Sequence, residues 1–442
     1  MWLIVMLETL GTNSPGSLLR NVLLRILYSF LFYLVIPAVL ARLFWRSLKE
    51  PLYRQNLLQR FGFVNIEKEV GSELIWVHSV SAGETIAAAP LVRRLVTRGF
   101  TVLMTTMTPT GWERVLDLLG DSVLHSYAPY DLPDAVGRFL ERSKPKCLVI
   151  IDTELWPNII HQCSLRNVKT ILVNGRLSAR SAAGYKKISG LAKPMLQEID
   201  YLAVQTFSHG RRFIDLGLGE EKLVVAGSIK FDQELPADFN EKVSQLRGKV
   251  GDRLIVIGAS THRGEEEMIL NAFRSIRSSH KELLLILAPR HPHRSNEVAE
   301  LVEKAGETLQ LHSDNRNCND STTVLLLDVM GELIYFYGIS DIAIVGGSFV
   351  PVGGHNLMEA VHAQVPVIMG PHLENIEDIA SMFVDNGGMR IARDAAELNV
   401  ALGSLVSSAD ERRHLVAQAN DVLKINQGAL DKVENLIIQS IT

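Results

Sequence analysis

The sequence predicts an α/β protein with two Rossmann-like domains facing a cleft, preceded by an apolar helix. Short apolar strands alternate with helical segments from residue 74 onward, and a polar stretch, Phe231 to Gly251, interrupts the series. Glycine-rich turns follow several of these strands. Such alternation is typical of parallel sheets, whose ligands bind at the carboxyl ends of the strands. A length of 442 residues with 47% apolar composition suffices for two or three domains.

Composition excludes several classes of protein. A net charge of −4 provides no basic footprint for nucleic acid. The three cysteines have neither metal-ligand spacing nor the pattern of a disulfide framework, which suits a reducing compartment. The sequence contains no Asp-x-Asp metal clamp, no Walker-type Gly-Lys-Ser/Thr and no internal repeat.

An apolar segment near the N-terminus predicts association with a membrane. Residues 1–17 end in GTNSPGS, and we expect a flexible extension there. The sixteen residues from Ile26 to Ala41 carry no charge, slightly short of the about 20 that a spanning helix needs. Interfacial aromatic residues and an excess of basic residues flank them. We therefore expect residues 18–50 to form an anchor helix that spans the bilayer or lies in its interface, with the later domains cytoplasmic; a buried core helix is the alternative.

The first domain is expected over residues 51–232. Its predicted strands are Leu74–Val80, Thr101–Thr106, Cys147–Ile151, Thr170–Val173, Tyr201–Val204 and Leu223–Ala226. Residues 233–250 are predicted to be a linker, because they are polar and contain Pro236.

The second domain is expected over residues 251–442, with a helical tail from about residue 395. Its predicted strands are Leu254–Gly258, Leu283–Leu287, Val324–Leu327, Ile342–Val345 and Val365–Met369. After the fourth of these strands, glycine pairs lead through Asn356 into a short helix, a geometry that favours an anion such as phosphate. A capping box between Asn356 and Glu359 is the structural alternative.

Charged residues follow the predicted strands of both domains. Glu84 and Glu154 come after strands of the first domain, where a carboxylate could act as a general base. For Glu84 the alternative is a first-turn residue that complements the helix dipole. Cations and glycine-rich turns end strands of the second domain, as in PRHP. The pattern therefore predicts carboxylates on one domain and an anion site on the other.

Twelve motifs in one order resemble those of the 3-deoxy-D-manno-octulosonic acid (Kdo) transferases of Gram-negative bacteria, and the resemblance covers residues from about 45 to 430. They are SVSAGET, TTMTPTG, PYDLP, TELWPN, NGRLSARS, GSIKFD, STHRGEE, PRHPHR, MGEL, YGISDIAIVGGS, GGHNLMEA and MGPH. The resemblance implies a GT-B glycosyltransferase fold and transfer of Kdo from CMP-Kdo to a lipid A precursor of the lipid IVA type. It places this reaction at the cytoplasmic face of the inner membrane, without a metal or another cofactor. The implied partners are CMP-Kdo, the lipid A precursor and the membrane, with no nucleic acid.

The resemblance also implies roles for individual residues. Glu84 of SVSAGET is the expected general base, and Glu154 and Lys230 are expected to support the transition state. The implied CMP-binding residues are Pro289, Arg290, Met330, Gly331, Glu332, Asn356, Leu357, Met358 and Glu359. Further substrate contacts are expected at Ser81, Gly83, Arg176, Ser260, Gly347 and Ser348.

Two positions depart from some family members: Ala82, where others have valine, and Pro351-Val352, where others have a Glu-Arg pair. The second change removes charges near the expected cleft and leaves the contacts there open. One rival function is a GT-B transferase or epimerase that uses a UDP-sugar, against which Glu84 and the PRHP motif count. Another is a membrane-bound nucleotide-binding module without chemistry, against which the retention of Glu84, Glu154 and Lys230 counts.

Overall fold

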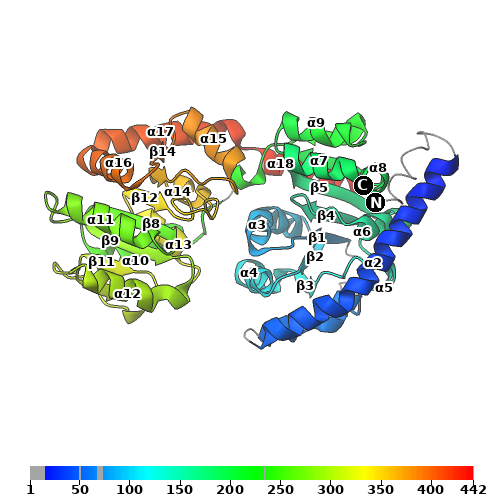
Figure 1. The fold of residues 1–442 in the computed structure, drawn as a ribbon, viewed down its shortest axis with the longest axis horizontal. Coiled ribbons are helices and arrows are strands. Elements are labelled where there is room, and N and C mark those ends of the chain that lie inside the picture. Colours follow the sequence, from blue (N-terminus) through cyan, green and yellow to red (C-terminus); the bar gives the residue numbers. More distant parts are fainter. Residues whose placement is uncertain (1–14, 49–50, 67–72, 233, 442) are drawn as a thin grey trace. The chain divides into compact units, whose positions relative to one another are not determined.

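The chain folds into two compact units, each built on a parallel sheet of seven strands (Figure 1). The computed structural model describes residues 15–48, 51–66, 73–232 and 234–441. The first unit comprises residues 1–232 together with 427–442, and the second comprises residues 233–426. Two Rossmann-like units are therefore present, as the sequence predicts.

The first sheet has the strand order β3-β2-β1-β4-β5-β6-β7, with every neighbouring pair parallel. Its central strands are apolar and fully buried, because helices cover both faces. The short strand β3 is missing from the sequence prediction. The strands are β1 (Leu74–His78), β2 (Thr101–Thr106), β3 (Leu124–Tyr127), β4 (Cys147–Ile151), β5 (Lys169–Gly175), β6 (Tyr201–Val204) and β7 (Leu223–Val225).

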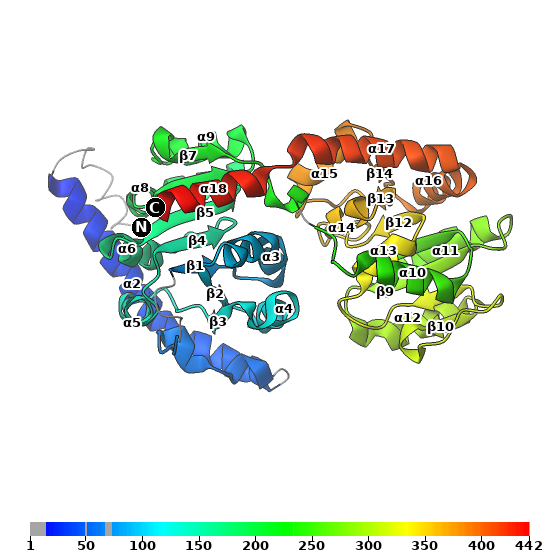
Figure 2. The same cartoon turned by 180° about the vertical axis from the view of Figure 1, so that it is seen from behind.

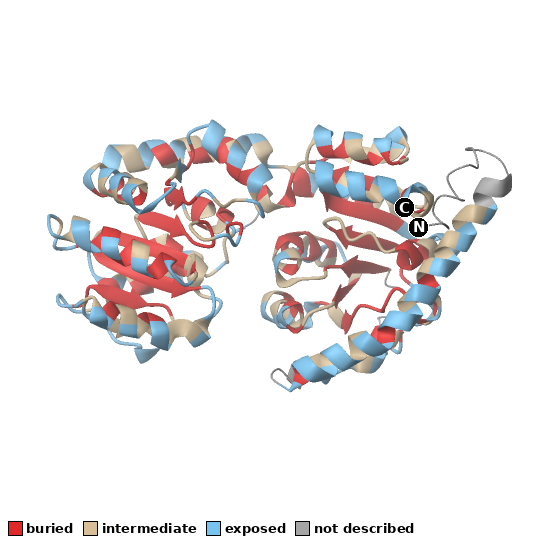
Figure 3. Cartoon of the chain, in the orientation of Figure 1, coloured by how far each residue is buried: buried red, intermediate tan, exposed pale blue. Residues whose placement is uncertain are grey.

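The helices of the first unit join these strands and form two apolar cores, one on each face of the sheet; the buried strands stand out in Figure 3. They are α2 (Pro15–Ser47), α3 (Ala82–Thr97), α4 (Pro109–Leu119), α5 (Pro133–Ser143), α6 (Pro157–Leu165), α7 (Ala179–Lys187), α8 (Ser189–Gln197), α9 (Phe207–Asp215) and α18 (Ala429–Ile441).

The second sheet has the order β10-β11-β9-β8-β12-β13-β14, again parallel throughout. The sequence prediction lacks β10 and β14, which are short strands at its two edges. The strands are β8 (Ile255–Thr261), β9 (Leu284–Pro289), β10 (Leu309–Leu311), β11 (Val324–Leu326), β12 (Ile342–Val345), β13 (Val367–Met369) and β14 (Arg390–Ile391).

The expected linker over residues 233–250 is wrong for most of its length, because a helix, α10, covers Phe239–Val250. Leu246 and Val250 are buried, and Arg247 donates to the carbonyl of Ile339, so α10 packs on the second unit. The remaining helices of this unit are α11 (Glu265–Arg277), α12 (Ser295–Lys304), α13 (Leu333–Ile339), α14 (Met358–His362), α15 (Glu377–Asp385), α16 (Ala395–Ser407) and α17 (Ala409–Asn426).

The C-terminal boundary of the second domain is also wrong, since α18 belongs to the first unit (Figure 2). The carboxylate of Asp232 accepts hydrogen bonds from the N–H groups of Gly428 and Leu430, both at 2.7 Å, and caps the start of α18. Leu430 and Val433 then enter the core with strands β1 and β4. The last helix is needed to complete a core that begins at residue 74.

The predicted anchor segment forms one long helix, α2, which starts at Pro15, before the expected boundary at residue 18. Residues 1–14 of the predicted flexible extension, and residues 49–50, lie outside the described residues. By length and composition, Leu19–Ser47 could cross a membrane. One face of α2 lies on the first unit, where Ile36 packs with Tyr130, Leu132 and Ala135.

Asp131 joins α2 to the rest of the first unit. Its carboxylate accepts from the N–H groups of Asn158 (3.1 Å) and Ile159 (2.7 Å) in the first turn of α6, and from the hydroxyl of Tyr28 in α2 (2.9 Å). The side chain of Trp156, the N-cap residue of α6, makes no capping hydrogen bond. Asp131 caps the helix instead, from elsewhere in the chain. Burial raises the pKa of Asp131 to about 6, although these hydrogen bonds oppose the shift.

The raised pKa of Asp131 predicts a pH dependence of stability. An ordinary aspartate titrates near 3.8, so the folded chain holds this proton more tightly than the unfolded chain does. The resulting stabilisation is full below about pH 4 and is lost as the pH rises through about 6. Relative to Asp131→Asn, we expect the free energy of unfolding of the wild type to fall by roughly 3 kcal/mol between about pH 4 and pH 7. Denaturant titrations of both proteins across this range measure the two free energies of unfolding. A wild type that becomes more stable relative to Asp131→Asn as the pH rises contradicts the prediction.

Candidate functional site

The first sheet reverses its strand order between β1 and β4, which are neighbours although β2 and β3 intervene in the chain. At such a reversal the loops that follow the two strands leave in opposite directions and open a crevice. The loop after β1 carries Ser81 and Glu84, and the loop after β4 carries Asp152 and Glu154. The two expected catalytic carboxylates thus lie at one place in the first unit.

Glu84 forms a capping box at the start of α3. Its Oε2 accepts from the N–H of Val80 (2.6 Å) and its Oε1 from the hydroxyl of Ser81 (2.8 Å). Ser81 is the N-cap, whose hydroxyl oxygen accepts from the N–H of Glu84. Glu84 therefore occupies the first turn of α3, and burial raises the pKa of its carboxyl in spite of its hydrogen bonds. Its role as the general base stays a prediction. Gly83 lies in the first turn, with no backbone strain.

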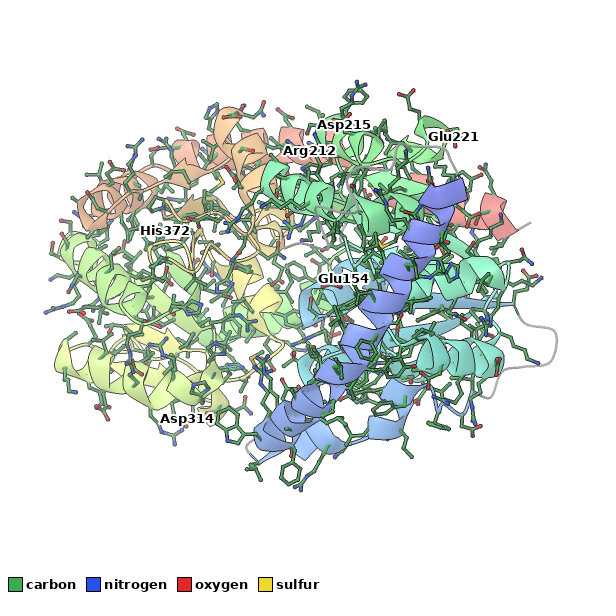
Figure 4. The ribbon with its side chains drawn as sticks, turned by 45° about the vertical axis from the view of Figure 1, so that its right-hand side comes forward. Glu154, Arg212, Asp215, Glu221, Asp314 and His372 are labelled. Atoms are coloured by element: carbon green, nitrogen blue, oxygen red, sulfur yellow. The ribbon has the colours of Figure 1, made fainter. Side chains whose placement is uncertain are left out.

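Glu154 follows β4 and is labelled in Figure 4. Its Oε2 accepts from the indole N–H of Trp156 at 3.1 Å. Burial, together with the charges of Glu84 and Asp152, raises the pKa of Glu154 to about 7. A carboxyl that titrates near neutral pH can hold or accept a proton during a reaction.

Asp152 and Asn174 connect the loops after β4, β5 and β7. Both have left-handed backbones, with φ of 58° and 61°. The carboxamide of Asn174 donates to Asp152 and, through Oδ1, accepts from the N–H of Ile229 (3.3 Å), next to Lys230. The ammonium group of Lys230 has no hydrogen bond or ion pair to any residue that the structure describes. At Arg176, the backbone N–H donates to Thr153, which links β5 to β4.

The second sheet reverses between β8 and β12, and a single carboxylate joins the loops that follow them. Glu265 is fully buried. Its Oε2 accepts from the N–H groups of His262 and Gly347, both at 2.8 Å, and its Oε1 from those of Ser348 (3.1 Å) and Phe349 (2.9 Å). Four backbone N–H donors therefore stabilise the buried charge of one carboxylate.

This arrangement changes the expected role of the glycine-rich turn after β12. Glu265 already occupies the N–H groups of Gly347 and Ser348. The hydroxyl of Ser348 donates to Val345 and accepts from Gly370. A Cβ at Gly346 would lie 2.7 Å from the Glu265 carboxylate, which is why the turn needs glycine. The internal bonds argue against substrate contact at Gly347 and Ser348 through these groups, and an anion has to bind elsewhere at this edge.

Histidine and arginine side chains gather at the same reversal. The Nε2 atoms of His262 and His355 lie 2.7 Å apart, so one ring donates to the other. Burial, together with the positive charges that His262 and Arg290 can carry, lowers the pKa of His355 to about 4. Arg290 follows β9, and its exposed guanidinium has no hydrogen bond or ion pair to a described residue. This cation is available to an anionic ligand.

The neighbouring carboxylate, Glu266, fixes the loop that carries Arg290. It accepts from the hydroxyl of Thr261 (2.9 Å) and from the guanidinium of Arg294 (2.7 Å). The N–H of Arg290 donates to the carbonyl of Thr261 at 3.0 Å. A depression of about 460 Å³ beside this loop is lined by His262, Arg263, His293, Arg294 and Glu297.

The other expected CMP-binding residues also follow strands of the second sheet. Pro289 ends β9, and Ser260, with φ of 53°, lies in β8. After β11, Met330 is exposed, Gly331 has φ of 86°, and the carboxylate of Glu332 accepts from Nε2 of His312 at 2.8 Å.

The short helix α14 contains the last expected CMP-binding residues. Asn356 precedes it and accepts from the N–H of Met358 (3.2 Å), while Leu357 is its N-cap and Glu359 lies in its first turn. Glu359 stays a predicted ligand. All the expected CMP-binding residues lie at the carboxyl edge of the second sheet.

Comparison with known proteins identifies the family. Residues 55–233 match the family model of 3-deoxy-D-manno-octulosonic-acid transferase (kdotransferase), and residues 238–422 match that of glycosyl transferases group 1. A 3-deoxy-D-manno-octulosonic acid transferase of Haemophilus influenzae is 41% identical over 93% of this chain and 98% of its own length. The chain belongs to the Kdo transferase family. It is a glycosyltransferase, as its motifs predict.

Solved structures agree on the fold. A glycosyltransferase of Rickettsia africae is similar with a TM-score of 0.56 and 15% identity, covering 84% of this chain and 99% of its own. A UDP-GlcNAc 2-epimerase of Neisseria meningitidis has a TM-score of 0.57 and 12% identity, with the same coverage. These confirm the GT-B type of fold and, at such identities, nothing about the substrate.

Sequence reasoning missed the residues that hold the Kdo transferase site together. Glu265, Asp152, Asn174 and Asp131 each bond to loops that are far away in the chain. Two signals were present in the sequence: each residue lies in or beside a motif of the family, and Asp152 and Asn174 immediately follow apolar strands or end them.

We expect Glu265→Gln to weaken CMP binding and to lower stability together. Glutamine keeps the size of the side chain, but its amide group has one acceptor oxygen for four N–H donors. Each buried donor left unpaired costs about 1–3 kcal/mol. Glu267→Gln, at an exposed residue in the same helix turn, is the control. Isothermal titration with CMP and thermal unfolding measure the two effects; unchanged values for both contradict this role of Glu265.

Proposed function

We propose that this Kdo transferase moves Kdo from CMP-Kdo to a hydroxyl group of a lipid A precursor of the lipid IVA type. The hydroxyl oxygen bonds to the anomeric carbon of Kdo as the bond from that carbon to the CMP phosphate breaks. The hydroxyl proton passes to a carboxylate, and the bonding electrons leave with CMP. The transfer is proposed to need no metal ion.

The observation that carries this proposal is the pair of half-buried carboxyls, Glu84 and Glu154, at the reversal of the first sheet. Glu84 takes the proton, as the family resemblance implies. Glu154 supports positive charge at the sugar or orients Lys230, whose ammonium group has no partner among the described residues. A pKa raised toward neutrality suits proton transfer at the pH of the cytoplasm.

The donor is proposed to bind the second unit. Arg290 neutralises the phosphate charge that grows as CMP departs, since its guanidinium is exposed and unpaired among described residues. Glu359 is proposed to bind the ribose hydroxyls. The hydrogen-bonded rings of His262 and His355 lie beside Arg290, and the pair can donate a hydrogen bond to phosphate.

The proposed location is the cytoplasmic face of the inner membrane, with α2 as the anchor. Its apolar run and the basic residues after it support this location. A chain that begins near Leu52 is expected to leave the membrane fraction, and full retention contradicts the anchor.

We expect Glu84→Gln to lower Kdo transfer by about 10²–10⁴ while CMP still binds. Glutamine preserves the capping box with Ser81, so the start of α3 survives, but it does not accept the proton. Transfer of Kdo from CMP-Kdo to the lipid precursor is followed by mass spectrometry.

The matched controls separate chemistry from capping. Thr206→Ala removes the N-cap of α9, another helix that follows a strand of the same sheet, and should cost about 1 kcal/mol of stability with little loss of transfer. Glu154→Gln tests the rival base. If Glu84→Gln transfers at the wild-type rate and Glu154→Gln does not, the base is Glu154.

Glu359→Gln should lower the affinity for CMP without changing the melting temperature. Glutamine suits a capping role equally well, so a purely structural Glu359 predicts unchanged affinity. Titration calorimetry with CMP decides between the two.

A further inference from the structure

The helix α2 has two faces of opposite character. The face toward the first unit carries polar groups with partners there: Tyr28 donates to Asp131, and Ser29 exchanges hydrogen bonds with Asn158. Arg25 lies 3.8 Å from the carboxylate of Glu198. The partners are spread over the loop before α5 and over α6 and α8, so the helix lies along the unit rather than leaving it at one end (Figure 1).

The opposite face of α2 is apolar and uncovered. Leu23, Phe30 and Leu34 are 53%, 57% and 61% exposed, and Trp45 near the end is 71% exposed. Leu23, Phe30, Leu34 and Ala41 follow the spacing of one helical stripe. An exposed apolar stripe of this length indicates that this face of the helix contacts an apolar partner rather than water.

The docked contacts are incompatible with a helix that crosses the bilayer. Crossing would bring Tyr28 and Ser29, which lie within the apolar run, to the hydrocarbon region together with Asp131 and Asn158, or would break their bonds. Asp131 is only 2% exposed, and a buried carboxyl that loses a hydrogen-bond partner destabilises the fold. Gly190 of α8 supports the close packing, because a Cβ there would lie 2.5 Å from Leu24.

We propose that α2 lies in the plane of the membrane interface, with its outward stripe among the lipid chains and the first unit on its other face. This rests on the membrane association proposed above. An anionic lipid surface is the occupant that the charges favour: α2 contains no acidic residue, and exposed Arg42 and Arg46 flank the stripe beside Trp45.

The orientation has a consequence for the acceptor. Asn158, the partner of Ser29, lies four residues after Glu154, at the start of the helix that Asp131 caps. A flat α2 therefore holds the Glu154 loop near the lipid surface, where the sugar hydroxyls of a membrane-bound acceptor are found.

The test is a depth profile of spin labels on the full chain. Single cysteines replace Leu23, Phe30, Leu34 and Ala41 in a Cys318→Ser background, since Cys147 and Cys163 are buried. The vesicles contain phosphatidylethanolamine and phosphatidylglycerol, and power saturation with oxygen and a nickel chelate gives the depth of each label. A flat helix predicts nearly equal depths of about 5–10 Å at all four positions.

Three results would overturn the proposal. A spanning helix separates residues 23 and 41 by about 27 Å along its axis, so the depths would pass through a maximum near Phe30 and Leu34. Spin–spin broadening that persists at high dilution in lipid would show a second copy on the stripe. If the protein binds the vesicles but its spin labels stay accessible from water, another part of the chain attaches it to the membrane.

Two further measurements separate this proposal from the functions on which it rests. Flotation of the same variants with vesicles reports membrane association itself; a chain that does not float refutes both. Kdo transfer in detergent reports the proposed reaction independently of orientation. A spin label at Ser29→Cys, on the face of α2 toward the first unit, is the matched control. It should be accessible to neither oxygen nor the nickel chelate.

Discussion

In both sheets the strand order reverses between two central neighbours, β1 and β4 in the first unit and β8 and β12 in the second. Parallel strands require crossover helices, so the loops after these neighbours must leave in opposite directions. The reversal therefore gives each unit one place where side chains from distant parts of the chain meet at the carboxyl edge. Every residue of the proposed chemistry lies at that edge, on a loop, at a strand end or in the first turn of the helix that follows.

The carboxylates at the two reversals differ in the number of hydrogen bonds that they accept. In the second unit, four N–H groups surround Glu265, which fixes the loops and leaves Arg290 exposed. In the first unit, Glu84 and Glu154 have fewer donors, and burial together with neighbouring charge raises their pKa values. A fully bonded carboxylate builds structure, whereas a partly bonded one retains the ability to take a proton.

Local pattern was sufficient for the buried strands, because runs such as Cys147–Ile151 are apolar throughout. It failed at the edge strands β3, β10 and β14, which are short, and at α18, whose apolar face fits a core that begins some 350 residues earlier in the chain. Glu84 was predictable from its place after a strand. The role of Glu265 was not, because its partners come from the turn after β12, and nothing local links the two.

The central claim is that the nucleotide binds the second unit while the proton acceptor lies on the first. Hydrogen–deuterium exchange of the full chain with and without CMP tests it directly. Peptides that cover residues 258–265, 289–294 and 353–360 should exchange more slowly with CMP, and those that cover 79–84 and 152–158 should not change. Slower exchange confined to the peptides of the first unit would contradict the account.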